Sequence, residues 1–348
     1  MTWVKILLGV YVSKDHRVLT GITTTGVPHL GNLVGAILPA INASKQKNTT
    51  SFLFLADYHS LIKNTDSGLR HQSSFEIAAC WLACGLNPDK VIFYRQSDIP
   101  HIFELAWILS CLSAKGLLNR AHAYKAATSE NEIQKTQDID KGVNMGLFNY
   151  PILMAADILM FKADSVPVGQ DQKQHIEMTR DIAMKFNHLY GDILTIPEAV
   201  IDENTGILPG IDGRKMSKSY ENTIPVFSEE ENLKKVVMKI QTNSLEPGER
   251  KDTSESNIFN IYKAISSEEK IHDLEKLYEE GIAWGEAKNI LFEELNSFLK
   301  PFKQEYNKII KDKSFVEKTL MEGSEKALSV SEPIIKKVRE AIGIKGFE

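Results

Sequence analysis

Cysteine is scarce in this chain of 348 residues, and its scarcity restricts the sites that the sequence can build. The three cysteines, Cys80, Cys84 and Cys111, cannot all pair, and the first two lie one turn apart in a stretch that predicts an apolar helix. We therefore expect buried free thiols. Because no CxxC pair or Cys/His cluster accompanies them, the sequence predicts no zinc or iron–sulfur site.

Long hydrophobic runs are also missing. No apolar segment approaches the roughly 20 residues that a membrane-spanning helix requires. The short apolar run within residues 1–16 is not followed by a small-residue cleavage site, so we interpret it as a cytosolic extension rather than a signal peptide. The sequence predicts a cytoplasmic protein with no membrane contact.

An excess of positive charge is absent as well. The chain has 41 Lys and Arg against 46 Asp and Glu, a formal net charge of -5. A polyanionic partner would therefore have to meet a local basic patch. With 43% apolar residues, the chain can bury a full core, and its length is typical of about two domains.

Short β-branched or aromatic runs, at 18–20, 52–55, 91–94 and 166–168, alternate with longer segments of helical period. This alternation predicts an α/β fold, a Rossmann-like parallel sheet flanked by helices. Ligands of such sheets gather at the carboxyl ends of the strands, near the point where the strand order reverses. Gly21, Asp57 and Gly169 each follow a predicted strand, so we expect them to face that crevice.

The composition of the sequence changes after about Pro225, where no further strands are predicted and charged residues become more frequent. Apolar residues then repeat at helical spacing, which predicts a smaller, all-helical domain. We expect a nucleotide-binding catalytic domain over 1–208, a loop over 209–222, a helical domain over 223–312, and a C-terminal helix over 313–348 that can pack back on the first domain.

A glycine-bearing turn at 21–32, GITTTGVPHLGN, follows the first predicted strand and opens the first long helix. Glycine lets a backbone approach a phosphate, and a helix N-terminus offers unpaired N–H groups. His29 and Asn32 can add hydrogen bonds to ATP, while Gly31 leaves room for a flat base or ribose. A plain tight connection is the alternative. The Walker lysine and the GxGxxG pattern are both missing, which disfavours the two commoner nucleotide folds.

A second glycine-bracketed loop, GIDGRKMSKS at 210–219, carries Lys215 and Lys218. Departing pyrophosphate gains negative charge in the transition state, and mobile ammonium groups that reach it only then lower the barrier selectively. The alternative is a solvated basic loop.

The KMSKS sequence at 215–219, downstream of a PHLGN variant of the HIGH signature at 28–32, resembles the class I aminoacyl-tRNA synthetases. The stretches YPILMAADIL at 150–159 and VPVGQDQKQHIE at 166–177 closely resemble bacterial tryptophanyl-tRNA synthetases. The likeness extends over most of the chain and weakens in the helical part.

This resemblance implies that ATP activates L-tryptophan to tryptophanyl-adenylate, which is then transferred to the 3′ end of tRNA(Trp). It also implies Mg²⁺ bound with ATP rather than a dedicated metal site, a homodimer, and a helical domain that reads unstacked anticodon bases. The expected catalytic group is His29, Lys215, Ser217 and Lys218.

Selection of tryptophan needs a particular pocket, because indole is a large apolar plate with a single donor, its N–H. Asp157, in an otherwise apolar helix, can accept from that N–H, with Met154, Val166 and Val168 as walls. Such a site would reject phenylalanine by leaving the carboxylate unpaired. The alternatives are a carboxylate on the helix surface for Asp157 and ordinary core packing for the walls.

By the same resemblance, Tyr150 and Gln172 would hold the α-amino group of tryptophan, and His59 would line the pocket. A structural histidine is the alternative for His59. Gly169, Gln170 and Asp171 form a strand-to-helix turn that should meet the ribose, although Asp171 could instead cap a helix. Ile207 or Leu208 would meet adenine through backbone groups. The expected ATP-binding set comprises Thr23, Thr24, Thr25, Gly26, Gly31, Asn32, Gly169, Gln170, Asp171, Ile207, Leu208, Lys215, Met216, Ser217, Lys218 and Ser219.

The chain departs from its relatives at two points. Many carry GIQPSG where this chain has GITTTG at 21–26, so a glutamine contact is lost or replaced by the hydroxyl of Thr23. Leu19 stands where some relatives have an aromatic lid over the indole. Lys125, in a polar loop expected after Arg120, is the candidate for a further triphosphate contact. The rival readings are a tyrosyl-tRNA synthetase and a catalytically silent paralogue that binds RNA or nucleotide.

Overall fold

The computed structural model describes residues 16–24, 26–62, 65–201 and 208–347, without the side chain of Asp171. The interpretations of the N-terminal extension, of Thr25 and of Ile207 therefore lie outside the described residues, as does the carboxylate of Asp171.

A five-stranded sheet forms the centre of the structure, in the order β3-β2-β1-β4-β5. All four neighbouring pairs are parallel. The strands are β1 (His16–Thr23), β2 (Thr49–Ala56), β3 (Ile92–Arg95), β4 (Ser165–Val168) and β5 (Glu198–Ile201). The chain builds outward from β1 to β3 and then crosses to β4 on the other side of β1, so the strand order reverses between β1 and β4. The predicted Rossmann-like sheet is confirmed, with β5 as an additional strand.

Side chains of each strand alternate between two apolar layers, as the pleat of a strand requires. Leu53 and Leu55 face a cluster that includes α4 (Ser67–Ala83). Phe52 and Phe54 face the opposite cluster. The first layer also contains the helix after β1, which consists of α1 (Leu30–Asn32), a π-helical turn (Leu33–Ile37) and α2 (Leu38–Ala43). The second layer contains α5 (Pro100–Leu112), α8 (Met145–Met160) and α9 (Lys173–Tyr190).

The part of the chain after Pro225 is helical, as predicted. Its helices are α10 (Glu230–Met238), α11 (Asn257–Lys263), α12 (Glu268–Glu279) and α13 (Trp284–Ile309). One continuous apolar cluster runs from Leu30 and Ile77 in the sheet part to Leu233 and Leu291 in the helical part. The two parts therefore share a core, and the boundaries given above for four units stay a prediction.

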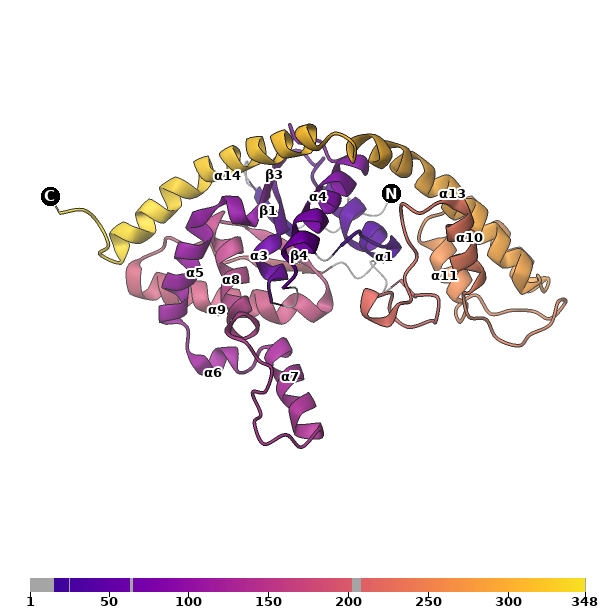
Figure 1. Cartoon of the computed structure of the whole chain (residues 1–348), viewed down its shortest axis with the longest axis horizontal. Coiled ribbons are helices and arrows are strands. Elements are labelled where there is room, and N and C mark those ends of the chain that lie inside the picture. The colour runs from indigo at the N-terminus through magenta and orange to yellow at the C-terminus, as the bar shows by residue number, and fades with distance from the viewer. Residues whose placement is uncertain (1–15, 25, 63–64, 202–207, 348) are drawn as a thin grey trace.

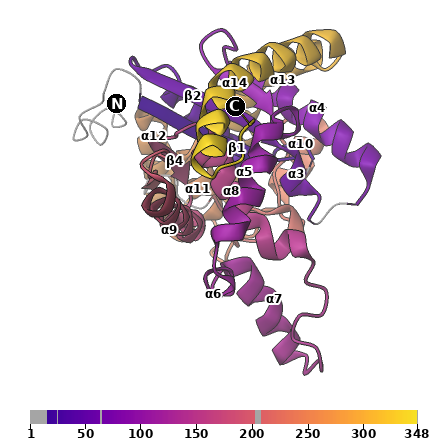
Figure 2. The same ribbon diagram turned by 90° about the vertical axis from the view of Figure 1, so that its left-hand side faces the viewer.

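The last helix, α14 (Lys313–Ala341), spans the molecule from the end of α13 to the far side of the sheet (Figures 1 and 2). Its middle lies against β3, the edge strand. A Cβ atom added to Gly323 would stand only 1.7 Å from the carbonyl oxygen of Phe93. Only glycine allows this approach of helix to strand.

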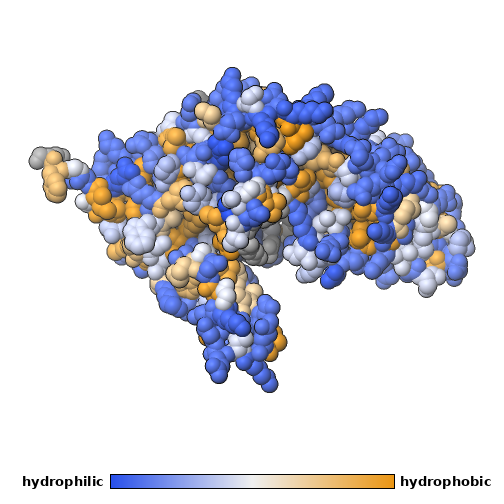
Figure 3. Space-filling view, in the orientation of Figure 1, coloured by the Kyte–Doolittle hydropathy of each residue, from blue (hydrophilic) through white to orange (hydrophobic). Residues whose placement is uncertain are grey.

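A helical arm formed by α6 (Lys115–Leu118) and α7 (His122–Ile133) projects from the sheet part (Figure 1). Figure 3 shows a deep notch between this arm and the helical part, on a face that is mainly hydrophilic with scattered hydrophobic patches. Lys125 lies within α7, so the expectation of a loop at that position is wrong.

The thiols only partly match their expected state. Cys80 and Cys84 are buried on α4, but Cys111 is exposed, because it lies on the face of α5 that points away from the core. In the part of the chain that the structure describes, no helix is long and apolar enough to cross a membrane.

Candidate active site

The helix after β1 begins with a reciprocal cap. The Nδ1 atom of His29 accepts from the backbone N–H of Asn32 at 3.4 Å, and the side-chain oxygen of Asn32 accepts from the backbone N–H of His29 at 3.2 Å. An accepting Nδ1 belongs to a neutral ring whose proton is on Nε2. Burial, together with the nearby charge of Lys218, lowers the pKa of His29 to about 4. His29 is therefore a neutral donor at pH 7.

The lysine loop lies directly against this helix start. The backbone N–H of Leu30 donates to the carbonyl of Ile224 at 2.9 Å, and the N–H of Gly31 points at the sulfur of Met216 at 3.3 Å. Gly26 has a φ of +92°, and a Cβ added there would stand 3.3 Å from the Nζ atom of Lys218. Two motifs nearly 200 residues apart in the sequence thus form one wall of a single site.

The turn also holds a buried hydroxyl and a partly buried cation. Thr24 is fully buried, and within the described residues its Oγ1 atom has no hydrogen-bond partner. Lys218 is exposed as a residue, but partial burial of its ammonium group lowers its pKa, against the opposing influence of Glu76. Lys218 therefore lies against the glycine turn with its ammonium group partly desolvated, which would strengthen its attraction for a phosphate.

Asn222, which the sequence analysis did not identify, holds the backbone of the lysine loop in place by hydrogen bonds to three of its residues. It is 1% exposed, and its Nδ2 donates to Asp212 at 2.7 Å and to the carbonyl of Lys215 at 3.1 Å. Its Oδ1 accepts from the N–H of Ser217 at 2.8 Å. The side chain of Lys215 is exposed, so the loop fixes its backbone while leaving its ammonium group at the surface.

Asp157 lies at the centre of the second part of the site. It is 1% exposed, so the alternative of a surface carboxylate is wrong. Its Oδ2 accepts from Nε2 of His59 at 2.8 Å, which brings these two predicted residues together. Burial raises the pKa of Asp157, while His59 and Gln96 act in the opposite direction.

Gln96 is a second residue that sequence reasoning missed. It is fully buried directly after β3, and its Nε2 donates to both oxygens of Asp157, at 2.8 and 3.0 Å. The signal was its position at the carboxyl end of a predicted strand, where ligand-facing residues gather.

A hydrogen-bonded chain joins the two residues expected to hold the α-amino group. The hydroxyl of Tyr150 bonds to Nε2 of His175, and Nδ1 of His175 bonds to the side-chain oxygen of Gln172 at 2.9 Å. His175 is 1% exposed and was not assigned from the sequence. These hydrogen bonds hold Tyr150 on α8 in a fixed position relative to the start of α9.

The expected apolar walls lie in the layer that contains α8. Val166 is 4% exposed, Leu19 is 2% exposed, and Met154 and Val168 are partly buried against the same cluster. A pocket of about 390 Å³ opens between α3 (Asp57–Ser60) and α8, and Tyr150 is the one residue of its lining that belongs to the expected tryptophan-binding set. It is lined by Tyr58, Leu61, Ile62, Asn144, Gly146, Asn149, Tyr150 and Leu153.

The other expected nucleotide contacts are placed at strand ends and loop ends. Gly169 and Gln170 are exposed immediately after β4, at the side of the sheet where the order reverses. The carbonyl of Leu208 accepts from the N–H of Met216 at 3.0 Å, so it lies at the stem of the lysine loop. Gly21 lies inside β1 rather than after it, whereas Asp57 directly follows β2.

The comparison with known families decides what this arrangement belongs to. The family described as tRNA synthetases class I (W and Y) matches residues 13–300, most of the chain. The chain belongs to this family. The glycine turn and the lysine loop of this synthetase carry its PHLGN and KMSKS motifs, and the predicted family, fold class and enzyme class are confirmed.

Individual relatives narrow the position of the synthetase within the family. The tryptophan–tRNA ligase of Neisseria meningitidis is 54% identical over 329 residues, which covers 94% of this chain and 98% of that protein. The tryptophan–tRNA ligase of Pseudomonas putida is 52% identical over 334 residues, covering 95% and 74%. The tryptophanyl-tRNA synthetase of Campylobacter jejuni, solved with ADP and tryptophan, superposes with a TM-score of 0.84 at 40% identity and covers 94% of this chain and 99% of that chain.

Proposed function

We propose that this chain is a tryptophan–tRNA ligase, which uses ATP to form tryptophanyl-adenylate and then passes the tryptophanyl group to tRNA(Trp). The observation that carries the amino-acid specificity is the buried carboxylate of Asp157. A carboxylate that is 1% exposed in an apolar layer can accept from an indole N–H, and no other group of tryptophan's side chain needs a polar partner. The identity with proteins named tryptophan–tRNA ligase supports the same conclusion.

In the first step, a carboxylate oxygen of tryptophan attacks the α-phosphorus of ATP, and the bond to the departing pyrophosphate breaks. No enzyme nucleophile is required. Neutral His29 and the backbone N–H groups of the glycine turn donate to phosphate oxygens, while Lys218 and Lys215 balance the charge that develops on pyrophosphate. In the second step, a terminal ribose hydroxyl of tRNA attacks the acyl carbon, and AMP leaves.

Mg²⁺ enters this proposal only with the nucleotide. Among the residues that the structure describes, no group of three or more His, Cys, Asp or Glu side chains could hold a metal ion. Phosphate oxygens and water are ligands that Mg²⁺ accepts readily, and the ion would supply charge neutralisation at the triphosphate. The groups that we propose to face the phosphates, His29, Lys215 and Lys218, are donors and cations.

We propose that the helical part reads the anticodon and that the active enzyme is a dimer in the cytoplasm, where tRNA is charged. A polar pocket of about 270 Å³ beside Trp284 offers amide and carboxylate groups to an unstacked base, and within the described residues the Trp284 N–H has no hydrogen-bond partner. The dimer can be tested at Trp107 on α5, which is 72% exposed, and at Met145 on α8, which is 67% exposed, because large apolar side chains that another subunit covers lose this exposure.

Amino-acid-dependent exchange of pyrophosphate with ATP tests the function. Wild-type protein should exchange with tryptophan and far less with tyrosine or phenylalanine. In Asp157→Asn, one acceptor oxygen becomes an NH₂ donor and the negative charge is lost, so the KM for tryptophan should rise by at least about tenfold, the cost of a lost hydrogen bond to a charged group. Exchange with tyrosine alone would identify a tyrosyl enzyme, and tRNA binding without any exchange would identify a silent paralogue.

A further inference from the structure

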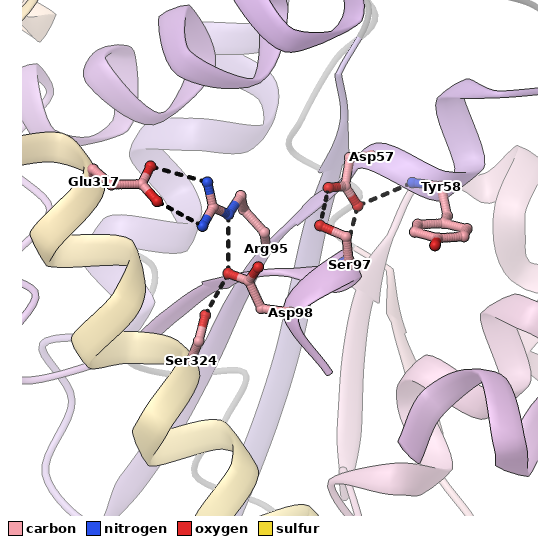
Figure 4. A network of polar contacts seen from close by, with 7 residues as sticks. All are labelled: Asp57, Tyr58, Arg95, Ser97, Asp98, Glu317 and Ser324. Atoms are coloured by element: carbon pink, nitrogen blue, oxygen red, sulfur yellow. Dashed lines mark hydrogen bonds and ion pairs between the residues drawn. The ribbon is translucent and has the colours of Figure 1, made fainter. Parts of the chain in front are cut away.

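The short turn after β3, Gln96–Asp98, connects two networks that face in opposite directions. Inward, Gln96 reaches Asp157, the proposed acceptor for the indole N–H. Outward, Asp98 and its neighbour Arg95 contact the C-terminal helix α14 (Figure 4). A turn with such contacts on both sides can transmit the position of a distant helix to the substrate site.

The inward side fixes the orientation of Gln96. Its Oε1 accepts from the backbone N–H of Tyr58 at 3.2 Å, while its Nε2 donates to both oxygens of Asp157. If the amide were reversed, its oxygen would face a carboxylate and its NH₂ group would face a backbone donor. The fully buried amide therefore has one favourable orientation, and in it both oxygens of Asp157 are held at fixed positions.

The same contact affects the charge of Asp157. Burial raises the pKa of this carboxyl group, and the hydrogen bond from Gln96 opposes that rise. A carboxylate can accept about four hydrogen bonds, and Gln96 and His59 use only part of this capacity. An ionised, oriented carboxylate with a remaining lone pair is what a buried indole N–H needs.

The outward side anchors the turn to α14. The guanidinium of Arg95 donates to both oxygens of Glu317, at 2.9 and 3.0 Å, and to Asp98 at 2.9 Å. Asp98 also accepts from the hydroxyl of Ser324 at 2.7 Å. These contacts flank the close approach of α14 to β3 at Gly323, so the turn is held against a rigid surface.

Ser97 completes the turn without touching Asp157. Its backbone N–H and its hydroxyl both donate to the carboxylate of Asp57 at the start of α3 (Figure 4). Ser97 therefore contributes to holding the turn in place but makes no direct hydrogen bond to Asp157, so its substitution separates loosening of the turn from loss of the direct contact.

We propose that Gln96 is a positioning residue for tryptophan selection, and that the contact of Arg95 with Glu317 on α14 keeps the Gln96 side chain within hydrogen-bond distance of Asp157. This inference rests on the proposed function, because it takes Asp157 as the indole acceptor. The helix that joins the helical part to the sheet thereby bears on which amino acid is accepted.

Pyrophosphate exchange of the full chain with Gln96→Met tests the inner contact. Methionine has nearly the same length but donates no hydrogen bond, so the KM for tryptophan should rise by at least about tenfold. The kcat at saturating tryptophan should change little, and the preference for tryptophan over phenylalanine should fall. The acid limb of kcat/KM should move to higher pH, because Asp157 loses a donor that favours its charged form.

The control Ser97→Ala loosens the turn but keeps the bond from Gln96 to Asp157, so it should raise the KM no more than Glu317→Gln does and should leave the pH profile unchanged, even if it lowers the melting temperature. Should Gln96→Met not fold, Gln96→Asn gives the same test, since the shorter side chain cannot reach both the N–H of Tyr58 and Asp157. A purely structural role for Gln96 would lower stability in all these variants without moving the pH profile, and that result would overturn the inference.

The outer contact is tested with Glu317→Gln on the surface of α14. It should raise the KM for tryptophan about two- to fivefold, the range of a well-formed exposed ion pair, and it should add nothing in the Gln96→Met background. An equal increase in both backgrounds would exclude transmission through Gln96. Wild-type protein that does not exchange with tryptophan would refute the proposed function itself, whereas normal exchange with an unaltered Gln96→Met variant would refute only the inference.

Discussion

The contact between the glycine turn and the lysine loop gives a direct test of the site through the substitution Gly26→Ala. Gly26 has a φ of +92°, and the added methyl group would stand 3.3 Å from Nζ of Lys218. The substitution therefore has two separate effects. It strains the backbone, and it pushes an ammonium group away from the place where we expect the phosphates.

The sizes of the two effects follow from the geometry. A non-glycine residue in the left-handed region costs roughly 1–2 kcal/mol, so the melting temperature should fall by a few degrees. An ordinary contact for a Cβ atom lies beyond about 3.4 Å, so Lys218 must move by a few tenths of an ångström. A misplacement of 1 Å can cost ~100-fold in rate, so a shift of ~0.3–0.5 Å corresponds to a fall of about four- to tenfold in kcat for adenylate formation.

Gly85 provides the matched control, because its φ is +93° and a Cβ added there would meet nothing within 4 Å. Gly85→Ala should lower the melting temperature by a similar amount and leave kcat unchanged. Both variants are compared by calorimetry and by single-turnover adenylate formation. If Gly26→Ala forms adenylate as fast as Gly85→Ala, the glycine turn and Lys218 do not act together during the reaction.

Two further predictions concern pH and packing. The pKa of His29 is about 4, below the 6.5 of a free histidine. As the pH falls, His29 is therefore protonated in the unfolded state before it is protonated in the folded state. The stability that neutral His29 contributes is complete above about pH 6.5 and is lost as the pH falls through 4. His29→Asn keeps the helix cap, so its melting temperature should decline less between pH 6.5 and 4, and parallel declines in the two proteins would contradict the burial of the ring. Gly323→Ala should lower the free energy of unfolding by at least ~2 kcal/mol in denaturant titrations, because its Cβ would overlap the carbonyl of Phe93. Gly285→Ala on α13, where a Cβ would meet nothing within 4 Å, should instead raise it by up to ~1 kcal/mol. Similar results for both variants would mean that α14 does not lie as closely on β3.

The sheet was largely predictable, because four of its strands are short apolar runs separated by helical periods. β5 was not, since it spans only four residues, and its apolar run at 199–201 follows Glu198 and is too short to be assigned to a strand by its pattern. The π-helical turn at Leu33–Ile37 also escaped prediction, because such turns depend on hydrogen bonding within the folded helix rather than on a local sequence signal.

For the site residues too, local sequence features were predictable and contacts between distant segments were not. Asp157 was identifiable, because a carboxylate in an apolar helix is conspicuous. Gln96 was not, because its importance depends on a partner 61 residues away along the chain, and a polar residue after a strand has many possible partners. The cap between His29 and Asn32 is local, but the approach of Lys218 to Gly26 exists only once the chain is folded.

The position of α14 has a consequence for how the protein is made. β3 is an edge strand, and a bare edge can pair with other chains. The helix that covers it is translated more than 200 residues later, which at typical ribosomal speeds is on the order of tens of seconds. Throughout that interval the nascent chain carries an unprotected strand, so premature termination before α14 would release a product prone to aggregation rather than a shorter working enzyme.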